Sequence, residues 1–470
     1  MKYNLRTTAN TSPLREQTRC SSIHMKVFLF TALFVIVLFL GISGAEAAPI
    51  YYVRAGAVGN GSGSDWTNAY TSLPASLVRG ATYYIADGSY AGYTFDDAQN
   101  GSTYIYIKKA TASDHGTDTG WSSSYGDGQA EFGPVSFSSG YYEIDGQTGG
   151  GNGSWDSGYG IRIRTTSNAT AKLVKFNTAV TNITFRHIDF SFDYNDGLTF
   201  PAGSQVAVSQ DAIYGTNSAS NMTFSYCRFN RAGRTAFLTR ATWNNIIIEH
   251  TYFRDCTIGT TSSNHGEIWS ANHGVNGLTN VTFRYNYVRN FTSTGGLILS
   301  GGNGIDIYGN IFQSTVIGSK ANGVIANWTA EPVTVNVRIY NNTFVDTDAR
   351  IGFGNTSGWV AYNNLFYSNT YIGFTNTTHD YNRSDVNLSE PNGEVNVADP
   401  FTNRAGNNFT LSAATKPGTN LSNVFTKDMN NNTMGADGTW DRGAFEFTSG
   451  ANPKRPSPPL HLSATAQAAL

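Results

Sequence analysis

The stretch Val281-Thr-Phe-Arg-Tyr-Asn-Tyr-Val288 has two close copies further along the chain, Ile305-Asp-Ile-Tyr-Gly-Asn-Ile-Phe312 and Val337-Arg-Ile-Tyr-Asn-Asn-Thr-Phe344. Each copy reads apolar, any residue, apolar, then a polar turn and an apolar closing residue. The alternating apolar residues are typical of a half-buried β-strand, and the polar residue marks a turn. A unit this short cannot bury its own apolar face, so it must stack on neighbouring units.

The pattern occurs seven times between Ile183 and Phe366, and its closing residues are Phe190, Phe229, Phe253, Val288, Phe312, Phe344 and Phe366. In the last four units an asparagine lies two positions earlier, at Asn286, Asn310, Asn342 and Asn364. The closing residues are 22 to 39 residues apart, so a constant strand alternates with loops of changing length. This favours a parallel β-helix over helical repeats, whose periods are stricter. We therefore expect an all-β protein, a single-stranded right-handed parallel β-helix.

Four parts are expected along the chain. Residues 1–47 hold an upstream segment and a signal peptide, 48–400 the β-helix, 401–447 a β-rich C-terminal closing segment, and 448–470 a Pro-rich linker or tail. A short helix at 69–73 is expected to cap the N-terminal end of the solenoid.

The N-terminal part predicts the compartment. Met25-Lys26 precedes the apolar run Val27–Ile42, and Ala45-Glu46-Ala47 follows it. A charged start, an apolar region and a small-x-small site are typical of a secretory signal peptide. Because the apolar run is short for a bilayer span, we expect cleavage after Ala47 and a secreted, extracellular protein.

Charge and cysteine content limit the partners. The formal net charge is −2 and only 14% of residues are charged, which gives no electrostatic case for nucleic-acid or membrane-surface binding. We expect a monomer whose partner is a polysaccharide. Cys227 and Cys256 are predicted to lie on neighbouring coils but five columns apart, too far for a disulfide, so both should be free, buried thiols.

The ends of the repeat region resemble those of a known superfamily. Tyr51-Tyr-Val53 with Asp65-Trp66, the Asn-x-Phe turns, and Asp441-Arg-Gly-Ala-Phe-Glu-Phe447 are similar to segments of secreted bacterial right-handed parallel β-helix proteins, the superfamily that includes pectate-lyase-like proteins. The resemblance covers about residues 50 to 447 and implies the fold. Lyases, hydrolases, epimerases and phage tailspikes share this scaffold, and no pectate-lyase catalytic signature transfers residue by residue.

The hexapeptide Asn264-His-Gly-Glu-Ile-Trp269 is the most unusual segment. If Ile268 points inward, strand alternation places His265, Glu267 and Trp269 together on the outer face. Glutamate can act as acid, base or metal ligand, histidine can move a proton near neutral pH, and tryptophan offers a flat platform to a sugar ring. The alternative is a solvated strand face with a chance cluster.

Arg254 and Arg289 follow the closing residues of consecutive units, so they should stack about 4.8 Å apart. Like charges placed opposite each other destabilise a sheet, and a bound uronate carboxylate would make the pair favourable. Alternatively, each arginine pairs with Asp255 or a loop carboxylate. A second column, Glu249, Arg284, Tyr308, Tyr340 and Tyr362, is predicted to be structural, with an ion pair between its first two members.

Two further cations are candidates for the base. Arg234 falls one coil before His265 if Phe237 aligns with Ile268, and Lys320 lies in a loop two coils later; either could take a proton if its pKa were lowered. Asp211 has the inward parity and is expected to be a turn or metal ligand rather than a partner of Glu267. The sequence contains no metal-ligand pattern, so the metal and cofactor are unknown, with Ca²⁺ as the candidate.

Together these residues predict an exported, polysaccharide-active protein that cleaves a uronate-containing glycan by β-elimination. The predicted catalytic residues are His265, Glu267, Arg289, Arg234 and Lys320, and the predicted substrate-binding residues are Trp269 and Arg254. Two alternatives stay open: a glycoside hydrolase on the same scaffold, and a non-catalytic extracellular glycan-binding or adhesive solenoid.

Overall fold

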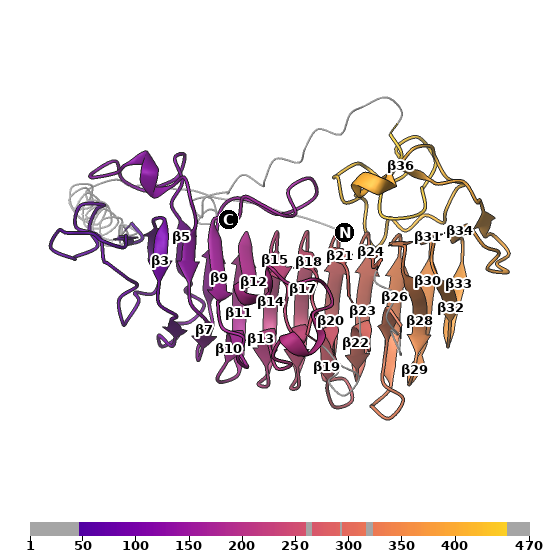
Figure 1. The fold of residues 1–470 in the computed structure, drawn as a ribbon, viewed down its shortest axis with the longest axis horizontal. Coiled ribbons are helices and arrows are strands. Elements are labelled where there is room, and N and C mark those ends of the chain that lie inside the picture. Colours follow the sequence, from indigo (N-terminus) through magenta and orange to yellow (C-terminus); the bar gives the residue numbers. More distant parts are fainter. Residues whose placement is uncertain (1–46, 260–265, 292–293, 316–322, 449–470) are drawn as a thin grey trace, which may run out of the picture. The chain divides into compact units, whose positions relative to one another are not determined.

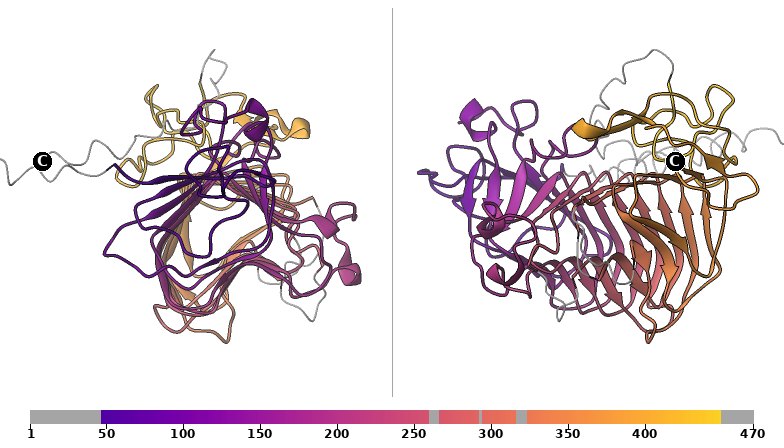
Figure 2. Two further views of the ribbon diagram at one scale, coloured as in Figure 1. Left: turned by 90° about the vertical axis from the view of Figure 1, so that its left-hand side faces the viewer. Right: turned by 45° about the vertical axis from the view of Figure 1, so that its right-hand side comes forward.

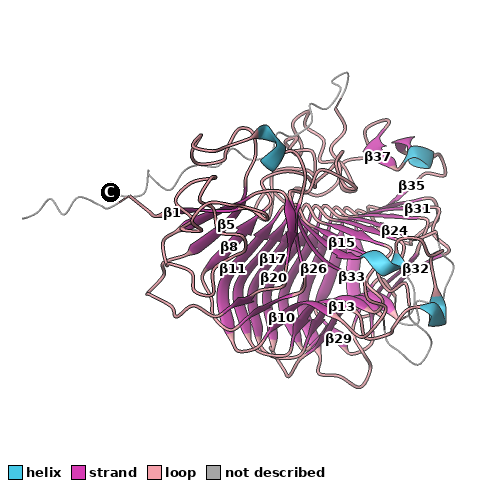
Figure 3. Cartoon of the chain, turned by 60° about the vertical axis from the view of Figure 1, so that its left-hand side comes forward, coloured by secondary structure: helices cyan, strands magenta, loops and turns pink. Residues whose placement is uncertain are grey.

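A computed structural model of the chain describes residues 47–259, 266–291, 294–315 and 323–448. It divides the chain into Met1–Ala48 and Pro49–Leu470, and the following concerns the second unit. Strands predominate (Figure 3), and the helices of the described ranges are short 3-10 turns at Ser123–Tyr125, Asp193–Asn195, Gly203–Gln205 and Arg404–Gly406. Within the described ranges no helix is long and apolar enough to cross a membrane.

The strands form three parallel sheets that run the length of the molecule (Figure 1). The first sheet consists of β1 (Ile50–Val53), β2 (Thr82–Ile85), β5 (Ile105–Lys109), β8 (Tyr142–Asp145), β11 (Val180–Arg186), β14 (Ala219–Ser225), β17 (Trp243–Glu249), β20 (Leu278–Arg284), β23 (Gly302–Tyr308), β26 (Thr334–Tyr340), β29 (Thr356–Ser357), β30 (Trp359–Tyr362) and β33 (Thr377–Asp380). The second sheet consists of β4 (Thr94–Phe95), β7 (Val135–Phe137), β10 (Lys172–Phe176), β13 (Asp211–Gly215), β16 (Thr235–Thr239), β19 (Glu267–Asn272), β22 (Gly295–Ser300), β25 (Ile325–Ala326), β28 (Asp348–Phe353) and β32 (Tyr371–Phe374). The third sheet consists of β3 (Gly88–Tyr90), β6 (Ala130–Phe132), β9 (Ile161–Thr165), β12 (Ile188–Phe192), β15 (Arg228–Asn230), β18 (Tyr252–Arg254), β21 (Tyr287–Arg289), β24 (Ile311–Gln313), β27 (Thr343–Val345), β31 (Leu365–Tyr367), β34 (Arg383–Ser384) and β35 (Glu394–Val395).

Each complete coil visits the three sheets in turn, and the view along the solenoid shows them enclosing the core (Figure 2). One or two residues link a first-sheet strand to a third-sheet strand in the central coils: His187 alone joins β11 to β12, and Tyr226 with Cys227 joins β14 to β15. His187 and Tyr226 both adopt positive φ. Loops of very different length then lead to the second sheet. The chain is a parallel β-helix, as the repeat pattern predicts.

The register of the closing residues is confirmed. Phe190, Phe229, Phe253, Val288, Phe312, Phe344 and Phe366 pair in register along the third sheet. All are 1% exposed or less, and the Phe312 and Phe344 rings stack with centroids 5.1 Å apart. Because each apolar side chain packs on the next, the core is continuous from coil to coil.

The repeated asparagines form a buried hydrogen-bonded ladder. The Nδ2 of Asn286 donates to Oδ1 of Asn310 at 3.0 Å, and the bond repeats from Asn310 to Asn342 (2.9 Å), from Asn342 to Asn364 (3.0 Å) and on to Asn382 (3.0 Å). Each Oδ1 also accepts the backbone N–H of the preceding asparagine. The ladder therefore satisfies amide groups that the turn buries.

Cys227 and Cys256 are free and buried, as expected. Burial raises the pKa of each thiol to about 12, so neither is a reactive thiolate at neutral pH.

The N-terminal edge is covered without the expected helix at 69–73. Asp65 Oδ1 accepts the backbone N–H of Asn68 at 2.8 Å, and Tyr70 instead forms a β-bridge with Val53. The following residues Leu73 and Leu77 are buried in the core of the solenoid. The capping side chain is present, but the chain after it continues as a loop.

The chain after the third sheet folds back over the solenoid. β36 (Phe401–Asn403) and β37 (Asn408–Leu411) form an antiparallel hairpin, and the motif at 441–447 follows it. Asn341 Nδ2 donates to the carbonyls of Asp441 (2.7 Å) and Gly443 (3.0 Å), and Trp440 Nε1 donates to Asn341 Oδ1 (3.1 Å). The returning segment 401–447 is called here the closing segment. Buried hydrogen bonds of the Asn341 side chain hold it to a turn of the solenoid.

Candidate functional site: a groove on the outer face of the third sheet

The outer face of the third sheet carries a ladder of opposite charges. Glu131, Arg162, Asp189 and Arg228 pair in register on β6, β9, β12 and β15. Arg228 Nε and Nη2 reach the two carboxylate oxygens of Asp189 at 2.8 and 2.7 Å, and Arg162 lies 3.1 Å from Asp189 and 2.5 Å from Asp193. In this part of the face the positive charges are thus neutralised from within the protein.

The next two coils bring Arg254 and Arg289 together, as the sequence predicts. The two residues pair in register on β18 and β21. Arg254 Nη1 lies 3.4 Å from Asp156 Oδ1, which is the loop carboxylate of the alternative interpretation. For Arg289, by contrast, no carboxylate of the described residues lies within 4.0 Å of the guanidinium, whose Nη1 donates to the Tyr252 hydroxyl at 3.5 Å.

Arg289 lies on the wall of a cavity of 980 Å³. The outer faces of β18, β21 and β24 line one side of the cavity, the β8–β9 loop (146–160) a second, and the closing segment a third. Asn152 Nδ2 of the loop donates to Asn430 Oδ1 of the closing segment at 2.5 Å, which joins the two walls. Figure 1 shows both segments on the same side of the solenoid, the loop in purple and the closing segment in yellow.

Two smaller cavities continue the first along the solenoid. A cavity of 720 Å³ shares Arg289, Thr402 and Asn407 with it, and a cavity of 420 Å³ shares Asp156 and Ser157. Their lining residues extend from β9 to the end of β27. Seven third-sheet strands span about 29 Å at about 4.8 Å per coil, so the cavities form one groove long enough for an extended chain of small units. We call it the third-sheet groove.

Aromatic side chains line the groove beside Arg289. The Trp155 ring lies 5.9 Å from Tyr252 and 6.0 Å from Tyr287, and Phe409 lies 6.1 Å from Tyr287. Tyr252 and Tyr287 are buried, whereas Trp155 keeps part of its surface exposed. A planar apolar surface beside a cation suits a sugar ring that carries a carboxylate.

Glu446 is the carboxyl group of the closing segment that lines the 980 Å³ cavity. Glu446 is 5% exposed; its Oε1 accepts the backbone N–H of Gly435 at 2.7 Å, and its Oε2 accepts that of Asp441 at 3.3 Å. No Lys, Arg or His of the described residues lies within 4.0 Å of its carboxylate. Burial, and then the charge of Asp441, raise the pKa of Glu446 to about 7. A carboxyl group with such a pKa can accept or donate a proton at neutral pH.

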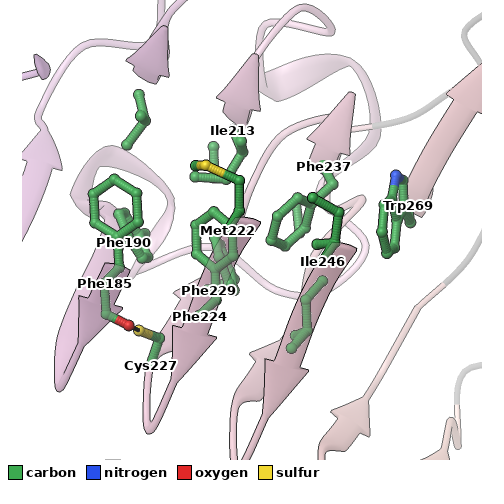
Figure 4. Close-up of a cluster of buried hydrophobic side chains, with 14 of the residues drawn as sticks. Phe185, Phe190, Ile213, Met222, Phe224, Cys227, Phe229, Phe237, Ile246 and Trp269 are labelled. Carbon is green, nitrogen blue, oxygen red and sulfur yellow. Dashed lines mark hydrogen bonds between the residues drawn. The ribbon is translucent and has the colours of Figure 1, made fainter. Parts of the chain in front are cut away.

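Trp269 does not lie on an outer face. It pairs in register with Phe237 and Leu297, is 1% exposed, and its ring lies among the core side chains (Figure 4). The predicted orientation is therefore wrong by one residue, because Trp269 and not Ile268 occupies the inward column. Trp269 has the larger apolar side chain of the two, and burying it contributes more to the core.

The same shift moves Glu267 away from the predicted outer face. Glu267 is 0% exposed, and its Oε1 accepts the Thr294 hydroxyl. Two positions before Trp269, it occupies the place that Thr235 occupies before Phe237, and Thr235 pairs in register with Asp211. Glu267 and Asp211 thus have the same parity, contrary to the prediction.

Arg234 is held by Asp211. Its Nε and Nη2 bind the two carboxylate oxygens at 2.7 and 2.6 Å, and Lys172 shares the same carboxylate. Burial lowers the pKa of Arg234, but the hydrogen bonds and charge of Asp211 outweigh it and raise the pKa. The lowered pKa that a base would need is absent. Arg234 also aligns with Gly266, since the register pairs Phe237 with Trp269.

The two remaining predicted residues, His265 and Lys320, lie outside the described residues. The predicted site is thereby divided: Arg254 and Arg289 face outward on the third sheet, whereas Arg234 and Glu267 lie at the beginning of second-sheet strands. Trp155 and Glu446 were missed by sequence reasoning. Two signals could have found them: Glu446 belongs to the terminal motif on which the family resemblance rests, and Trp155 lies in the Gly-rich segment 149–158.

The described residues do not fit the Ca²⁺ candidate. No group of three or more His, Cys, Asp or Glu side chains within these ranges is arranged to hold a metal ion. Asp428, Asp441 and Glu446 of the closing segment all use their oxygens to accept backbone N–H groups.

Comparison with known proteins gives structural likeness alone. No family model and no curated protein matches the sequence. The chain is similar to the crystal structure of pectate lyase Pel9A, with a TM-score of 0.49 and 15% identity over 86% of this chain and 98% of that one. It is also similar to the PL6 family alginate lyase AlyGC, with a TM-score of 0.30 and 11% identity over 68% of this chain and 51% of that one. The three parallel sheets themselves identify the fold.

Proposed function

We propose that this protein binds an acidic polysaccharide along the third-sheet groove and cleaves it by β-elimination. The observation that carries the proposal is Arg289, which borders two of the three connected cavities and has no carboxylate within 4.0 Å among the described residues. A partly buried guanidinium that no carboxylate contacts can bind the carboxylate of a ligand, and it can do so bidentately.

The chemistry follows from the position of that carboxylate. Neutralising a uronate makes the hydrogen on the adjacent ring carbon more acidic, because the developing charge is stabilised. Glu446, which lines the same cavity, is the candidate to accept this proton, since its pKa of about 7 leaves much of it ionised at neutral pH. The carbon–oxygen bond of the glycosidic link then breaks, a carbon–carbon double bond forms, and the leaving oxygen takes a proton from water. The hydroxide that remains takes the proton from Glu446 and restores the carboxylate.

Binding would use the aromatic wall as well as the charge. Trp155 lines the cavity, is partly exposed, and has its ring 5.9 Å from that of Tyr252 and 6.0 Å from that of Tyr287. Sugar rings have apolar faces that pack on such surfaces. The rigid sheet beneath would fix the distance between the aromatic wall and Arg289.

The test is to incubate the protein with a panel of acidic and neutral polysaccharides and to follow both retention and cleavage. We expect products with the ultraviolet absorbance of an unsaturated uronate, formed from acidic glycans alone. Retention without any product would leave a binding protein in place of an enzyme, and neither retention nor product would refute the proposal.

A glycoside hydrolase is the second candidate, and one observation favours it. Asp156 and Glu446 both line the 980 Å³ cavity, and most glycoside hydrolases use a pair of carboxyl groups. New reducing ends without ultraviolet absorbance would identify this reaction.

Export remains a proposal. It rests on the apolar run Val27–Ile42 with the site Ala45-Glu46-Ala47, which lies mostly outside the described residues. N-terminal sequencing of the protein from the culture medium tests it; we expect a mature chain that begins at Ala48.

A further inference from the structure

The lysines and arginines that line the third-sheet groove differ in whether a carboxylate of the protein already contacts them. Of the lysines and arginines that line its cavities, four are matched by carboxylates: Lys109 by Asp87 (2.6 Å), Arg162 by Asp193 (2.5 Å), Arg228 by Asp189 (2.7 Å), and Arg404 by Asp346 (3.5 Å) and Asp399 (3.6 Å). Within the described residues, Arg289 is the one groove-lining cation that no carboxylate approaches within 4.0 Å.

The remainder of the lining is acidic or neutral. Asp127, Asp156, Asp346, Asp399 and Glu446 all line the groove. Asp156 is paired with Arg254, and Asp346 and Asp399 are paired with Arg404, whereas no Lys, Arg or His of the described residues lies within 4.0 Å of Asp127 or Glu446. A glycan with a carboxylate on every unit would therefore bring several carboxylates to lining cations that already have a carboxylate partner, and some of them near Asp127 and Glu446, where like charges are unfavourable. Neutral sugar units meet no such penalty, because their hydroxyl groups can donate to carboxylates.

Asparagine and glutamine side chains also line the groove near Arg289. Asn407, Asn408, Asn430 and Asn432 line the 980 Å³ cavity around Arg289, and Gln313 follows it in register one coil on. An amide both donates and accepts hydrogen bonds, so it matches hydroxyl groups rather than a second carboxylate. On the other side, Arg254 already has Asp156 at 3.4 Å.

From this distribution we propose that the glycan of the third-sheet groove carries its acidic groups singly, with neutral units between them, and that one acidic unit is held at the coil of β21 by Arg289. The inference rests on the proposed function and narrows its substrate class. A homopolyuronate, in which every unit is charged, is the class that it excludes as the preferred ligand.

The experiment compares three probes of similar length by calorimetry at physiological ionic strength. Chondroitin alternates a uronate with a neutral sugar, carboxyl-reduced chondroitin is its uncharged counterpart, and polygalacturonate carries a carboxylate on every unit. A second alternating glycan, the galacturonate–rhamnose backbone, covers the case in which the sugar stereochemistry of chondroitin does not fit. We expect an alternating glycan to bind about tenfold or more tightly than either polygalacturonate or its own carboxyl-reduced form.

Variants locate the effect. Arg289→Gln should bind the alternating glycan and its carboxyl-reduced form equally, and Arg289→Lys should keep part of the difference. Arg338→Gln removes the same charge on the outer face of the first sheet, where Arg338 pairs with Asp306, and should change nothing. The thermal midpoints of all variants show whether each has folded.

The outcomes separate the two proposals. Polygalacturonate binding as tightly as the alternating glycans, or more tightly, would overturn the spaced-charge inference and leave the acidic-polysaccharide function standing. Equal binding of the charged and carboxyl-reduced forms by the unaltered protein would overturn both, as would failure of every acidic glycan to bind.

Discussion

Arg289 lies in register one coil beyond Arg254, yet the two guanidiniums differ in their surroundings: Arg254 has Asp156 at 3.4 Å, and Arg289 contacts the Tyr252 hydroxyl at 3.5 Å. Without the loops that cover the sheet, the two neighbouring arginines would have similar electrostatic surroundings. The β8–β9 loop makes them unequal, because it delivers Asp156 to one and Trp155 to the neighbourhood of the other. Within the described residues, Arg289 is therefore the member of the pair that no carboxylate contacts, which is why we propose it as the anion-binding residue.

Replacing Arg289 by glutamine should weaken binding of an acidic glycan about tenfold or more, because a charge-assisted hydrogen bond in a partly buried site is lost. The thermal midpoint should change little, since the side chain has no ionic partner among the described residues. Calorimetry and a thermal melt check the two expectations. A large loss of stability with unchanged affinity would show that Arg289 is structural.

The two tryptophans should respond in opposite ways. Trp269→Ala should destabilise the fold by about 3–5 kcal/mol, because a fully buried ring is replaced by a cavity. Trp155→Ala should lower glycan affinity and cost far less stability, since that ring is partly exposed. Denaturant titrations and binding isotherms of both variants check this. A stable Trp269→Ala protein with impaired binding would restore the outer-face interpretation.

The asparagine ladder should be costly to interrupt. In Asn310→Ala, the Nδ2 of Asn286 and its backbone N–H lose their acceptor in the buried turn, and each unsatisfied group costs about 1–3 kcal/mol. Asn303→Ala is the matched control, because the side chain of Asn303 makes its hydrogen bonds to Asn276 and Asn336 on the exposed face of the first sheet. We expect urea unfolding to separate the two variants clearly; equal midpoints would mean that the ladder contributes nothing special.

Glu446 should give a pH dependence to both stability and cleavage. Its pKa is about 7 in the folded state and about 4.3 in an unfolded chain, so the folded state holds an extra proton between these values. Stability should therefore fall as the pH rises from about 4.3 to about 7, while the cleavage rate rises through about pH 7 as the carboxylate forms.

Glu446→Gln is the variant that tests this. In this variant the free energy of unfolding should no longer fall because of residue 446 between about pH 4.3 and about pH 7. Cleavage should be abolished, while an acidic glycan still binds. Activity that persists in the folded variant would remove Glu446 from the mechanism.

The sequence predicted the fold well because the information is local and repeated. Each unit from Ile183 to Phe366 contains the same strand and turn. Stacking aligns the closing residues of these units even though the loops between them differ in length. The asparagine ladder and the pair of Glu249 with Arg284, 2.7 Å apart, follow from the same register.

The site could be predicted only in part. In Ile268-Trp269 two apolar residues stand side by side, so alternation alone does not tell which faces inward, and a shift of one residue reverses every assignment on β19. The groove also needs Asn152 to meet Asn430, 278 residues later, and no periodic pattern reports such a contact. Arg254 and Arg289 were found because the repeat itself places them.

The most direct test of the central claim is a crystal structure of the protein with a bound acidic oligosaccharide. We expect the glycan to lie along the third-sheet groove, with one carboxylate on the Arg289 guanidinium and a sugar ring beside Trp155. A glycan bound instead on the second sheet, near Arg234 and Glu267, would contradict the account and move the site to the other side of the solenoid.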